Sequence, residues 1–423
     1  MSLIALLGFG TVVLAAVVLL HSYVWFRLVR STTAPGRLRR RLTLLLVLLA
    51  VLPVAAVALR RSSLPLDLAT PLEWVAFTWL GTLFYLFLTL LALEPVRWAY
   101  GRAARRRSRR GAPALAGTAD LDEGTAPGGA VREDPEAQDP PAPSRRLFLA
   151  RTLAVTAGAV AVGTAGTGMY LANAAPVVRR VPIRLRGLDP ALDGLRIVTF
   201  SDGHLSATYG GRRFERLVET VNAQRPDVVA IVGDLVDGDV GELREEAAPL
   251  ADLVSEQGVF FVTGNHEYFV DTEAWLRHLP TLGVDVLRNE RVPIRRGSAT
   301  FDLAGIDDRT AASSGLAGHG ADLDAALDGR DDDVPVVLLA HQPVQVEQAR
   351  AAGVDLQLSG HTHGGQLWPF DYAIRLDQPA VEGLSRHGDT QLYVTSGAGF
   401  WGPPMRIGAR PEVTVVELRA PGA

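Results

Sequence analysis

Apolar residues are spread very unevenly along the chain. In the first 100 residues, three stretches are almost wholly apolar, at 3–26, 42–59 and 74–93. A helix needs about 20 apolar residues to cross a bilayer, and each stretch is near that length. A fourth, weaker stretch runs from Leu147 to about Leu171 and is rich in Ala, Gly, Val and Thr. We therefore predict an all-α transmembrane region with three helices in residues 1–100 and a fourth in residues 145–173.

The pattern changes in residues 174–423, where short β-rich runs alternate with amphipathic segments. Helices are predicted at 212–222, where apolar residues recur with helical spacing, and at 241–256. Buried strands are predicted at 195–200, 227–232, 259–263, 336–340 and 354–358. Later runs at 391–395 and 413–418, together with 300–304, indicate a second sheet packed on the first. The predicted fold class is α/β, with two packed sheets inside and helices outside.

Side chains with metal-binding chemistry follow five of these strands. They are Asp202 and His204, then Asp234, then Asn265 and His266, then His341, and last His361 and His363. In open α/β sheets, ligands bind at the carboxyl ends of the strands, so we expect these residues to form one site. Oxygen and imidazole ligands without thiolate suit manganese, iron or zinc. The set is large enough for two ions that share a carboxylate, an arrangement used for displacement at phosphorus.

The distribution of charge adds a prediction of membrane topology. The formal net charge is only −4, but all basic residues are arginine and they cluster beside the apolar stretches. The first loop carries Arg27, Arg30, Arg37, Arg39, Arg40 and Arg41. The segment after the third stretch carries Arg97, Arg102, Arg105, Arg106, Arg107, Arg109 and Arg110, whereas the second loop has only Arg60 and Arg61. The positive-inside rule places both clusters in the cytoplasm. We expect no nucleic-acid partner, because these clusters flank membrane spans.

Residues 101–144 are predicted to be a basic and then disordered cytoplasmic linker. Residues 111–143 contain Ala, Pro, Gly, Asp and Glu with almost no large apolar side chains, so they cannot offset their ordering entropy by burial. The chain has no cysteine, which excludes disulfides and thiol chemistry.

The fourth stretch begins with S-R-R-L-F-L-A, which resembles a twin-arginine export signal with Arg145 and Arg146 as the pair. Its internal position departs from that pattern, and the alternative is a plain arginine flank of a fourth transmembrane helix. Cleavage near Ala172, Ala174 or Ala175 is left open. Both interpretations place residues 174–423 outside the cytoplasm, in a multi-pass protein of the cell membrane.

The five polar blocks occur in the order D-G-H, G-D, G-N-H-E, a lone His after a strand, and G-H-T-H. In this order they resemble the calcineurin-like metallophosphoesterase superfamily, over roughly residues 190–420. The longer blocks G-D-L-V-D, G-N-H-E-Y and G-H-T-H-G-G-Q-L resemble a bacterial membrane-associated branch that is often exported by the twin-arginine route.

This resemblance implies two divalent metal ions. It assigns Asp202, His204 and His363 to the first ion and Asn265, His341 and His361 to the second, with Asp234 bridging both. The metals would supply a hydroxide at neutral pH and bind the phosphoryl oxygens. His266 would be a catalytic residue that binds no metal and stabilises the transition state or protonates the leaving oxygen.

Other residues near the blocks receive weaker assignments. Gly233, Gly264 and Gly360 precede ligands and would allow close backbone approach. Asp237 and Glu267 are candidates for orienting the ligands, with a solvated turn as the alternative. We place His278, His319 and His387 on the surface or in loops, and we assign Asp307 and Asp308 to a turn. In 397–406, Phe400 and Trp401 could wall the site or anchor at the membrane interface, and Arg406 could contact a phosphate oxygen.

The leading functional hypothesis is a membrane-anchored hydrolase of phosphate mono- or diesters with its site outside the cytoplasm. One alternative is a lipid-directed phosphatase or pyrophosphatase, including one that acts on nucleotide-linked lipid precursors, although the predicted topology conflicts with a cytoplasmic substrate. Another alternative is a membrane sensor that binds metal without turnover. The presence of His266 beside a full ligand set argues against a pure binder.

Overall fold

The computed structural model describes residues 3–59, 66–110 and 145–422. The predicted disordered segment 111–143, and Arg60 and Arg61 of the second loop, lie outside the described residues. The chain divides into two compact units. The first unit comprises Met1–Ala15, Leu48–Thr82 and Val162–Ala423, and the second comprises Ala16–Val47 and Leu83–Ala161.

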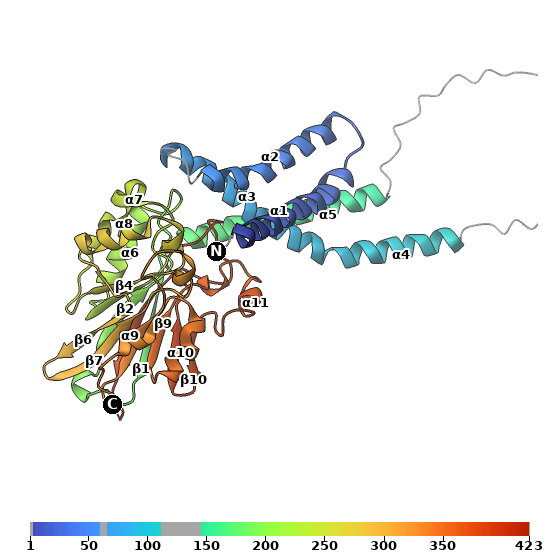
Figure 1. Cartoon of the computed structure of the whole chain (residues 1–423). Helices are drawn as coiled ribbons and strands as arrows, with labels where there is room; N and C mark the ends of the chain where they lie inside the picture. Colours follow the sequence, from blue (N-terminus) through green and yellow to red (C-terminus); the bar gives the residue numbers. More distant parts are fainter. Residues whose placement is uncertain (1–2, 60–65, 111–144, 423) are drawn as a thin grey trace, which may run out of the picture. The chain divides into compact units, whose positions relative to one another are not determined.

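Long helices account for the described part of the chain before the sheets (Figure 1). They are α1 (Leu3–Trp25), α2 (Arg37–Leu59), α3 (Leu66–Ala92), α4 (Glu94–Arg110) and α5 (Arg145–Asn173). Four segments are long and apolar enough to cross a membrane by length and composition: Gly10–Arg30, Arg37–Ala58, Leu68–Ala103 and Arg145–Asn173. Residues 101–110, predicted as the start of a linker, instead continue α4. Alanine and arginine are strong helix formers, so this basic segment extends the helix rather than ending it.

Within the second unit, polar contacts fix the ends of the helices. Glu94 at the start of α4 accepts hydrogen bonds from the Tyr23 hydroxyl at 2.8 Å and from Arg27 at 2.6 Å. Arg151 of α5 donates to the carbonyl oxygen of Thr32, in the loop after α1. Arg27 thus pairs with a carboxylate, and Arg151 donates a hydrogen bond to a loop carbonyl oxygen.

The remaining elements form two six-stranded sheets, ordered β1-β12-β2-β3-β4-β5 and β10-β11-β9-β8-β7-β6. The strands of the first sheet are β1 (Val177–Arg184), β2 (Arg196–Phe200), β3 (Val228–Val232), β4 (Val259–Val262), β5 (Asp285–Val286) and β12 (Glu412–Arg419). Those of the second sheet are β6 (Glu290–Arg296), β7 (Ala299–Gly305), β8 (Val336–Leu339), β9 (Leu356–Ser359), β10 (Gly383–His387) and β11 (Thr390–Val394). The α/β sandwich predicted from the sequence is therefore confirmed.

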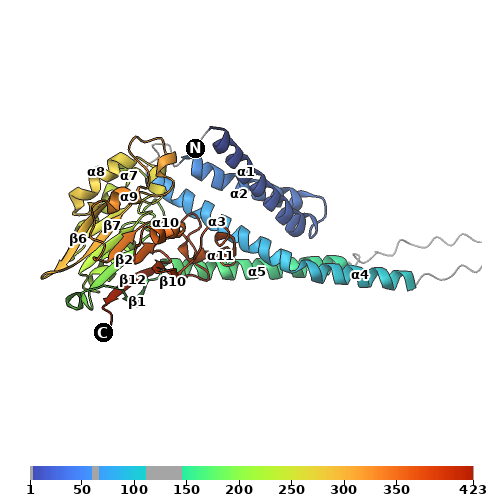
Figure 2. The same ribbon diagram turned by 60° about the horizontal axis from the view of Figure 1, so that its bottom comes forward.

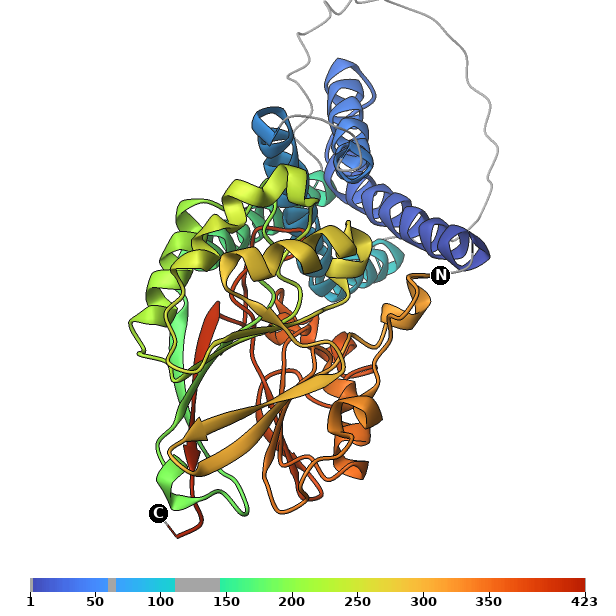
Figure 3. The same ribbon diagram turned by 60° about the vertical axis from the view of Figure 1, so that its left-hand side comes forward.

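Both faces of each sheet are covered, which explains why the central strands are apolar throughout. In β3, Val228, Ala230 and Val232 pack into the core between the sheets, while Val229 and Ile231 pack against the outer helices. Parallel strands buried on both faces lose the alternation of apolar and polar residues. The outer helices are α6 (Arg212–Asn222), α7 (Val240–Ala247) and α8 (Thr272–His278) over the first sheet, and α9 (Leu323–Leu327) and α10 (Val346–Ala351) over the second. Figure 3 shows these two groups of helices on opposite sides of the strands.

Two predictions about these elements need correction. The helix predicted at 241–256 ends at Ala247, and a 3-10 turn follows at Ala248–Asp252. Pro249 lies in this turn, and proline has no amide proton to continue the i→i−4 hydrogen bonds of an α-helix. The strand predicted at 413–418 belongs to the first sheet, where β12 pairs antiparallel with β2 and parallel with β1.

Parts of α3 and α5 pack on the sandwich within the first unit. The Trp74 ring of α3 contacts Phe400 edge-on at 6.5 Å, and the Arg213 guanidinium lies 5.1 Å from the same indole ring. Near the end of α5, the carbonyl oxygen of Gly168 accepts a hydrogen bond from the Arg406 amide at 3.0 Å. The last turns of a membrane-type helix are thus bonded directly to the loops of the sheet domain.

Candidate metal centre

The residues predicted to bind metal lie just beyond the carboxyl ends of strands from both sheets. Asp202 and His204 follow β2, Asp234 follows β3, and Asn265 and His266 follow β4 of the first sheet; His341 follows β8 and His361 and His363 follow β9 of the second. The residues therefore converge from two packed sheets, whereas the sequence argument rested on one sheet edge.

The first group of side chains consists of Asp202, His204 and His363, all buried, with ligand atoms close enough to hold one ion. Nε2 of His363 lies 3.4 Å from Oδ1 of Asp202 and 3.0 Å from Nε2 of His204. Two imidazole nitrogens and a carboxylate oxygen thus point at one small volume. The Ser201 hydroxyl and the His361 amide both donate to the Asp202 carboxylate and fix its position.

The second group consists of Asp234, His341 and His361. His341 donates from Nδ1 to the carbonyl oxygen of Val232 at 2.8 Å, which leaves Nε2 as the nitrogen that faces the group. This nitrogen lies 3.1 Å from Oδ2 of Asp234 but makes no hydrogen bond, and Oδ1 of Asn265 is likewise buried without a partner. Buried polar atoms without partners are costly. An amide oxygen and an imidazole nitrogen can both be satisfied by a cation, so the donor set fits the metal that the sequence implies.

Asp234 lies between the two groups. Its Oδ2 is 3.8 Å from Nε2 of His204 in the first group and 3.1 Å from Nε2 of His341 in the second. Its Oδ1 accepts a hydrogen bond from the His266 amide at 2.8 Å. One carboxylate oxygen therefore faces imidazole nitrogens from both sheets, as a bridging ligand must.

The backbone at these residues is strained. Among the described residues, eight that are not glycine have positive φ, and five of them are candidate ligands: Asp202, His204, Asp234, His361 and His363. The left-handed region is uncommon for such residues and costs of order 1–3 kcal/mol each. Because the strained residues belong to one cluster, we infer that the fold holds the backbone in this conformation to orient the candidate ligand side chains toward one another.

Two glycines make room for this cluster. A Cβ on Gly264 would lie 2.2 Å from Oδ1 of Asp234, and a Cβ on Gly360 would lie 2.5 Å from Oδ2 of Asp202. No side chain fits at either distance. The predicted close approach of the backbone at these glycines is confirmed.

Asp237 orients two of the histidines. Its Oδ1 accepts from Nδ1 of His204 at 2.8 Å and from Nδ1 of His266 at 2.7 Å. Carboxylates that bind the outer nitrogen of a ligand histidine fix its tautomer and raise its basicity. The orienting role predicted for Asp237 is thus supported over a solvated turn.

Glu267 shapes the loop that carries the bridging residue. Its buried carboxylate accepts from the backbone amides of Asp234 at 2.9 Å, Leu235 at 2.8 Å and Gly264 at 2.6 Å. Burial and the neighbouring charge of Asp234 raise the pKa of Glu267 to about 7. The side chain holds the β3 and β4 loops together rather than facing solvent.

Charge and burial set the protonation of several candidate ligands. Burial raises the pKa of Asp234, but the charges of His341 and His266 outweigh burial and hold that pKa well below its ordinary value. Burial lowers the pKa of His361 to about 3, helped by the neighbouring His341. Burial and the charge of Arg406 hold the pKa of His363 well below its ordinary value. His361 and His363 are therefore neutral, which is the form of imidazole that binds metal.

Arg406 does not have the role predicted from the sequence. Its side chain is fully buried behind the site, and its guanidinium donates to the carbonyl oxygens of His363, Ser396, Gly397 and Gly399. One of its nitrogens also lies 3.2 Å from Nδ1 of His363. Arg406 thus supports the His363 loop and is not available to a phosphate oxygen.

The two aromatic residues of the same loop have different positions. Phe400 is buried against Tyr209, with ring centroids 5.6 Å apart, so it is part of the core. Trp401 is half exposed and its ring lies 5.6 Å from that of His266. Of these two residues, only Trp401 lines the site.

Several other polar residues are more deeply buried than the sequence indicates. His278 belongs to α8 and is buried, so neither a surface nor a loop position holds for it. His319 lies in a loop as predicted, but it is buried and bonds to the Tyr268 hydroxyl at 3.3 Å and to Glu273 at 2.8 Å. Asp307 pairs with Arg288 through two nitrogens, and Asp308 accepts from Gln342, which adjoins the ligand His341. Both carboxylates are buried, and the carbonyl oxygen of Asp308 accepts a hydrogen bond from the Ala311 amide at 3.0 Å, so Asp308 begins a turn as predicted.

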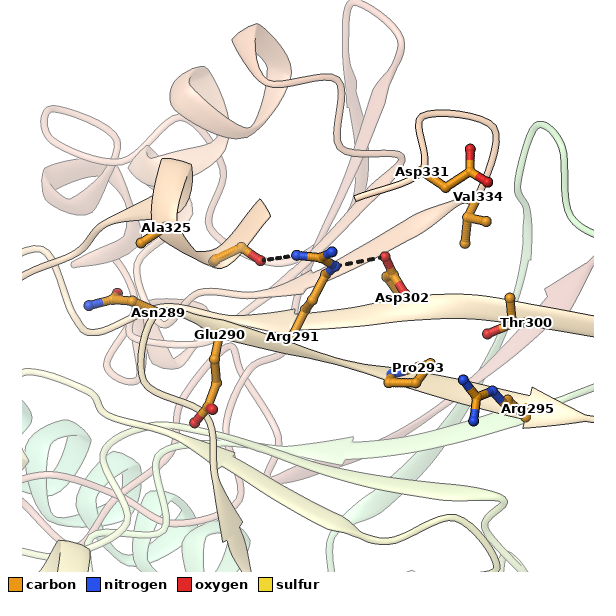
Figure 4. A pocket seen from close by; sticks show the side chains of 11 residues that line it. Asn289, Glu290, Arg291, Pro293, Arg295, Thr300, Asp302, Ala325, Asp331 and Val334 are labelled. Atoms are coloured by element: carbon orange, nitrogen blue, oxygen red, sulfur yellow. Dashed lines mark hydrogen bonds and ion pairs between the residues drawn. The ribbon is translucent and has the colours of Figure 1, made fainter. Parts of the chain in front are cut away.

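A concavity of about 640 Å³ lies over β6, β7 and α9 (Figure 4). Its floor includes Arg291, which pairs with Asp302 at 3.1 Å and donates to the carbonyl oxygens of Ala326 and Asp328. Within the described residues, no group of metal-type ligands occurs at this concavity. The chemistry of the molecule is therefore concentrated at the strand ends.

Comparison with known proteins agrees with this geometry. The family model for calcineurin-like phosphoesterases matches residues 195–365, which contain all the candidate ligands. A transmembrane protein with metallophosphoesterase domain from Danio rerio is 43% identical over 266 residues, or 60% of this chain and 61% of that protein. An uncharacterized metallophosphoesterase of Helicobacter pylori is 37% identical over 278 residues, or 65% of this chain and 73% of that protein.

A third relative is the uncharacterized metallophosphoesterase YkuE of Bacillus subtilis, which is 31% identical over 288 residues, or 66% of this chain and 98% of that protein. The chain spans less than two thirds of the Danio rerio relative. The likeness includes animal as well as bacterial proteins, so it is wider than the bacterial branch that the motifs resemble.

Proposed function

The chain belongs to the calcineurin-like phosphoesterase family, and from this premise we propose that it is a membrane-associated, metal-dependent hydrolase of phosphate mono- or diesters. The observation that carries the proposal is the position of Asp234. Its carboxylate lies between two groups of candidate ligands and faces imidazole nitrogens that come from both sheets.

We propose that Asp202, His204 and His363 hold one divalent ion, that Asn265, His341 and His361 hold the second, and that Asp234 bridges them. The unpartnered Oδ1 of Asn265 and Nε2 of His341 support the second set. Manganese, iron or zinc would suit these oxygen and imidazole donors. When bound, two such ions supply an activated water and stabilise charge on the phosphoryl oxygens.

His266 is the proposed proton donor to the leaving oxygen. Its Nδ1 is held by Asp237 at 2.7 Å, so its Nε2 faces the site, 4.0 Å from Oδ2 of Asp234. Burial lowers the pKa of His266, but the charges of Asp234 and Asp237 outweigh burial and raise it to about 9. The imidazole therefore carries a proton at neutral pH, as a general acid must. Bound cations would oppose the two carboxylates and bring this pKa down toward neutrality.

The His266–Asp237 pair also separates this proposal from a metal sensor without turnover. A binding site needs oriented ligands, and Asp237 provides that for His204. It has no need of a second oriented imidazole that holds a proton beside the bridging carboxylate. We therefore favour an enzyme.

The proposed location of the site is outside the cytoplasm, in a protein of the cell membrane. The arginine clusters of the first loop and of α4 support this orientation through the positive-inside rule. A reporter fused after Ala423 tests it. Activity of an extracytoplasmic reporter is expected, whereas activity of a cytoplasmic reporter alone would favour a substrate such as a nucleotide-linked lipid precursor.

The activity is tested with the full-length protein in detergent, purified with added Mn²⁺ and assayed on aryl phosphomonoesters and phosphodiesters. Metal-dependent turnover is expected, and Asp234→Asn and His266→Gln should nearly abolish it. Arg212→Gln, on the outer helix α6, serves as a control that should retain activity. No turnover on either ester class by metal-replete protein would refute the proposal.

A further inference from the structure

An exposed apolar surface lies next to the metal centre. Within the nine residues that follow Leu367, four large side chains are exposed: Trp368, Phe370, Tyr372 and Leu376, with exposed fractions of 54%, 54%, 64% and 89%. They flank or belong to the short helix α11 (Asp371–Ile374) and are called the α11 patch below. A soluble domain rarely exposes so many large apolar groups together unless another surface covers them.

The α11 patch is tied to the metal centre through the chain itself. It begins five residues after His363, and Gln366 in between bonds to both the amide and the carbonyl group of Trp401. Trp401 in turn lies against His266. The same loops therefore carry the site on one side and the exposed aromatics on the other.

The α11 patch is also tied to a membrane-type helix. The Trp368 amide donates to the carbonyl oxygen of Ile407 at 2.8 Å, and the neighbouring Arg406 amide donates to the carbonyl oxygen of Gly168 in α5. A Cβ on Gly168 would lie 3.0 Å from Met405 and 3.1 Å from Ile407, so the helix and this loop are in close contact. Figure 2 shows α11 on the side of the domain where α5 ends.

The depth of Gly168 follows from the length of α5. From Arg151, the last charged residue of α5, to Gly168 the helix rises about 26 Å, and the hydrocarbon core of a bilayer is about 30 Å thick. Gly168 therefore lies near the boundary opposite to the arginines. Two residues further on, Tyr170 is exposed, and tyrosine and tryptophan are the residues that favour this boundary.

We propose that the α11 patch inserts into the interfacial layer of the membrane that holds α5, and that the metal centre takes phosphate esters whose apolar part remains in that membrane. The second half of this inference rests on the proposed phosphoesterase function, and the first half does not. Aromatic side chains at the headgroup level bury their rings in the bilayer edge and leave their polar atoms hydrated. The site beside them then opens toward lipid headgroups.

The insertion is tested first, without reference to activity. The chain contains no cysteine, so Leu376→Cys gives a single site for an environment-sensitive fluorophore. The full-length protein is reconstituted into phosphatidylcholine vesicles with or without brominated acyl chains. Bromine should quench the label at 376 and leave a label at Val254→Cys unchanged. Val254 is exposed and precedes β4, so it lies at the amino ends of the strands, opposite to the edge that carries the metal centre. Equal fluorescence of the 376 label in both kinds of vesicle would overturn the insertion.

The substrate class is tested with a triple variant, Phe370→Ser/Tyr372→Ser/Leu376→Ser, against a control, Val254→Ser/Leu384→Ser, which removes exposed apolar side chains elsewhere. Both are assayed on bis(4-nitrophenyl) phosphate and on vesicles that contain phosphatidic acid or phosphatidylglycerol. The triple variant should lose about tenfold in rate on the vesicle esters and retain its kcat/KM on the soluble ester. The control should match the unaltered protein on both.

Each other outcome has a defined meaning. Equal loss on soluble and vesicle esters, or no loss on vesicles, would overturn the lipid-ester inference. Turnover of the soluble ester with none of either lipid would also overturn it. If no ester of any kind is hydrolysed, the proposed function fails, and the quenching result still decides whether the α11 patch enters the membrane.

Discussion

Nδ1 of His266 lies 2.7 Å from Oδ1 of Asp237, and this oxygen also accepts from His204. One carboxylate oxygen thus sets the orientation of a candidate metal ligand and of the proposed proton donor. Because both imidazoles point their other nitrogen into the site, their alignment depends on a residue that belongs to neither group of candidate ligands.

Replacing Asp237 by Asn should therefore lower turnover with little effect on the fold. The amide keeps the shape of the side chain but loses the negative charge that orients both histidines. Replacing a residue that orients metal ligands typically lowers metal affinity or activity about 10–100-fold. We expect kcat and the affinity for Mn²⁺ to fall together. Asp239→Asn is a matched control, because the Asp239 carboxylate accepts from the Asp271 amide instead of from a histidine, and it should leave both values unchanged.

Arg406→Lys tests the buried support of the His363 loop. Lysine keeps the charge but cannot donate at once to the four carbonyl oxygens that Arg406 reaches. The lost charged hydrogen bonds should reduce the free energy of unfolding by about 2–4 kcal/mol. Thermal unfolding of the full-length protein in detergent measures this, with the exposed Arg410→Lys as the control. An unchanged Tm for Arg406→Lys would contradict the structural role.

Gly264→Ala should displace the bridging carboxylate. The new methyl group would lie 2.2 Å from Oδ1 of Asp234, so the Asp234 side chain or its loop must move. A shift of about 1 Å in a reacting group can cost roughly 100-fold in rate, and we expect a loss of at least that size. Gly241→Ala, where a Cβ meets nothing within 4 Å, provides the comparison. Equal kcat values for the two variants would show that the packing at Gly264 is unimportant.

The stability of metal-free protein should depend on pH through His266. Its pKa in the folded protein is about 9, above the usual 6.5, so the folded state favours the protonated imidazole. This contribution is fully present below pH 6.5 and is lost as the pH rises through about 9. A shift of this size corresponds to about 3 kcal/mol.

The measurement compares the unfolding of chelator-treated protein with that of His266→Gln between pH 6 and 10. The difference in stability should be largest at the acidic end and shrink toward pH 10. Added Mn²⁺ should move the decline to lower pH, because bound cations lower the pKa of His266. A difference that is constant over the whole range would exclude the raised pKa.

Local patterns predict the elements that lie closest to the site. The apolar spacing of Phe214, Leu217 and Val218 predicts α6 with its observed bounds, and the strand-end positions of the ligands predict their convergence. These features depend on neighbours within a few residues, which a sequence displays directly. The end of α7 can also be predicted from the sequence, because Pro249 lies two residues after its last residue, Ala247.

Features that depend on distant parts of the chain are not predicted in this way. β12 joins β2 across more than 200 residues, and the sequence of 413–418 carries no sign of that partner. A phosphate contact is expected for Arg406 because arginine is usually exposed, whereas the loop 396–399 supplies enough carbonyl oxygens to bury it. His319 is expected at the surface or in a loop, and its loop is buried because Tyr268 and Glu273, about 50 residues earlier in the chain, supply its partners.

The left-handed backbone at five candidate ligands bears on which ions the protein selects. A flexible loop can wrap around ions of different radius, whereas a loop already wound into a costly conformation has little freedom to adjust. Selectivity among manganese, iron and zinc would then depend on how well each ion fits a cage of fixed size. The turns that hold Asp202 and His361 in place would then set the size of that cage.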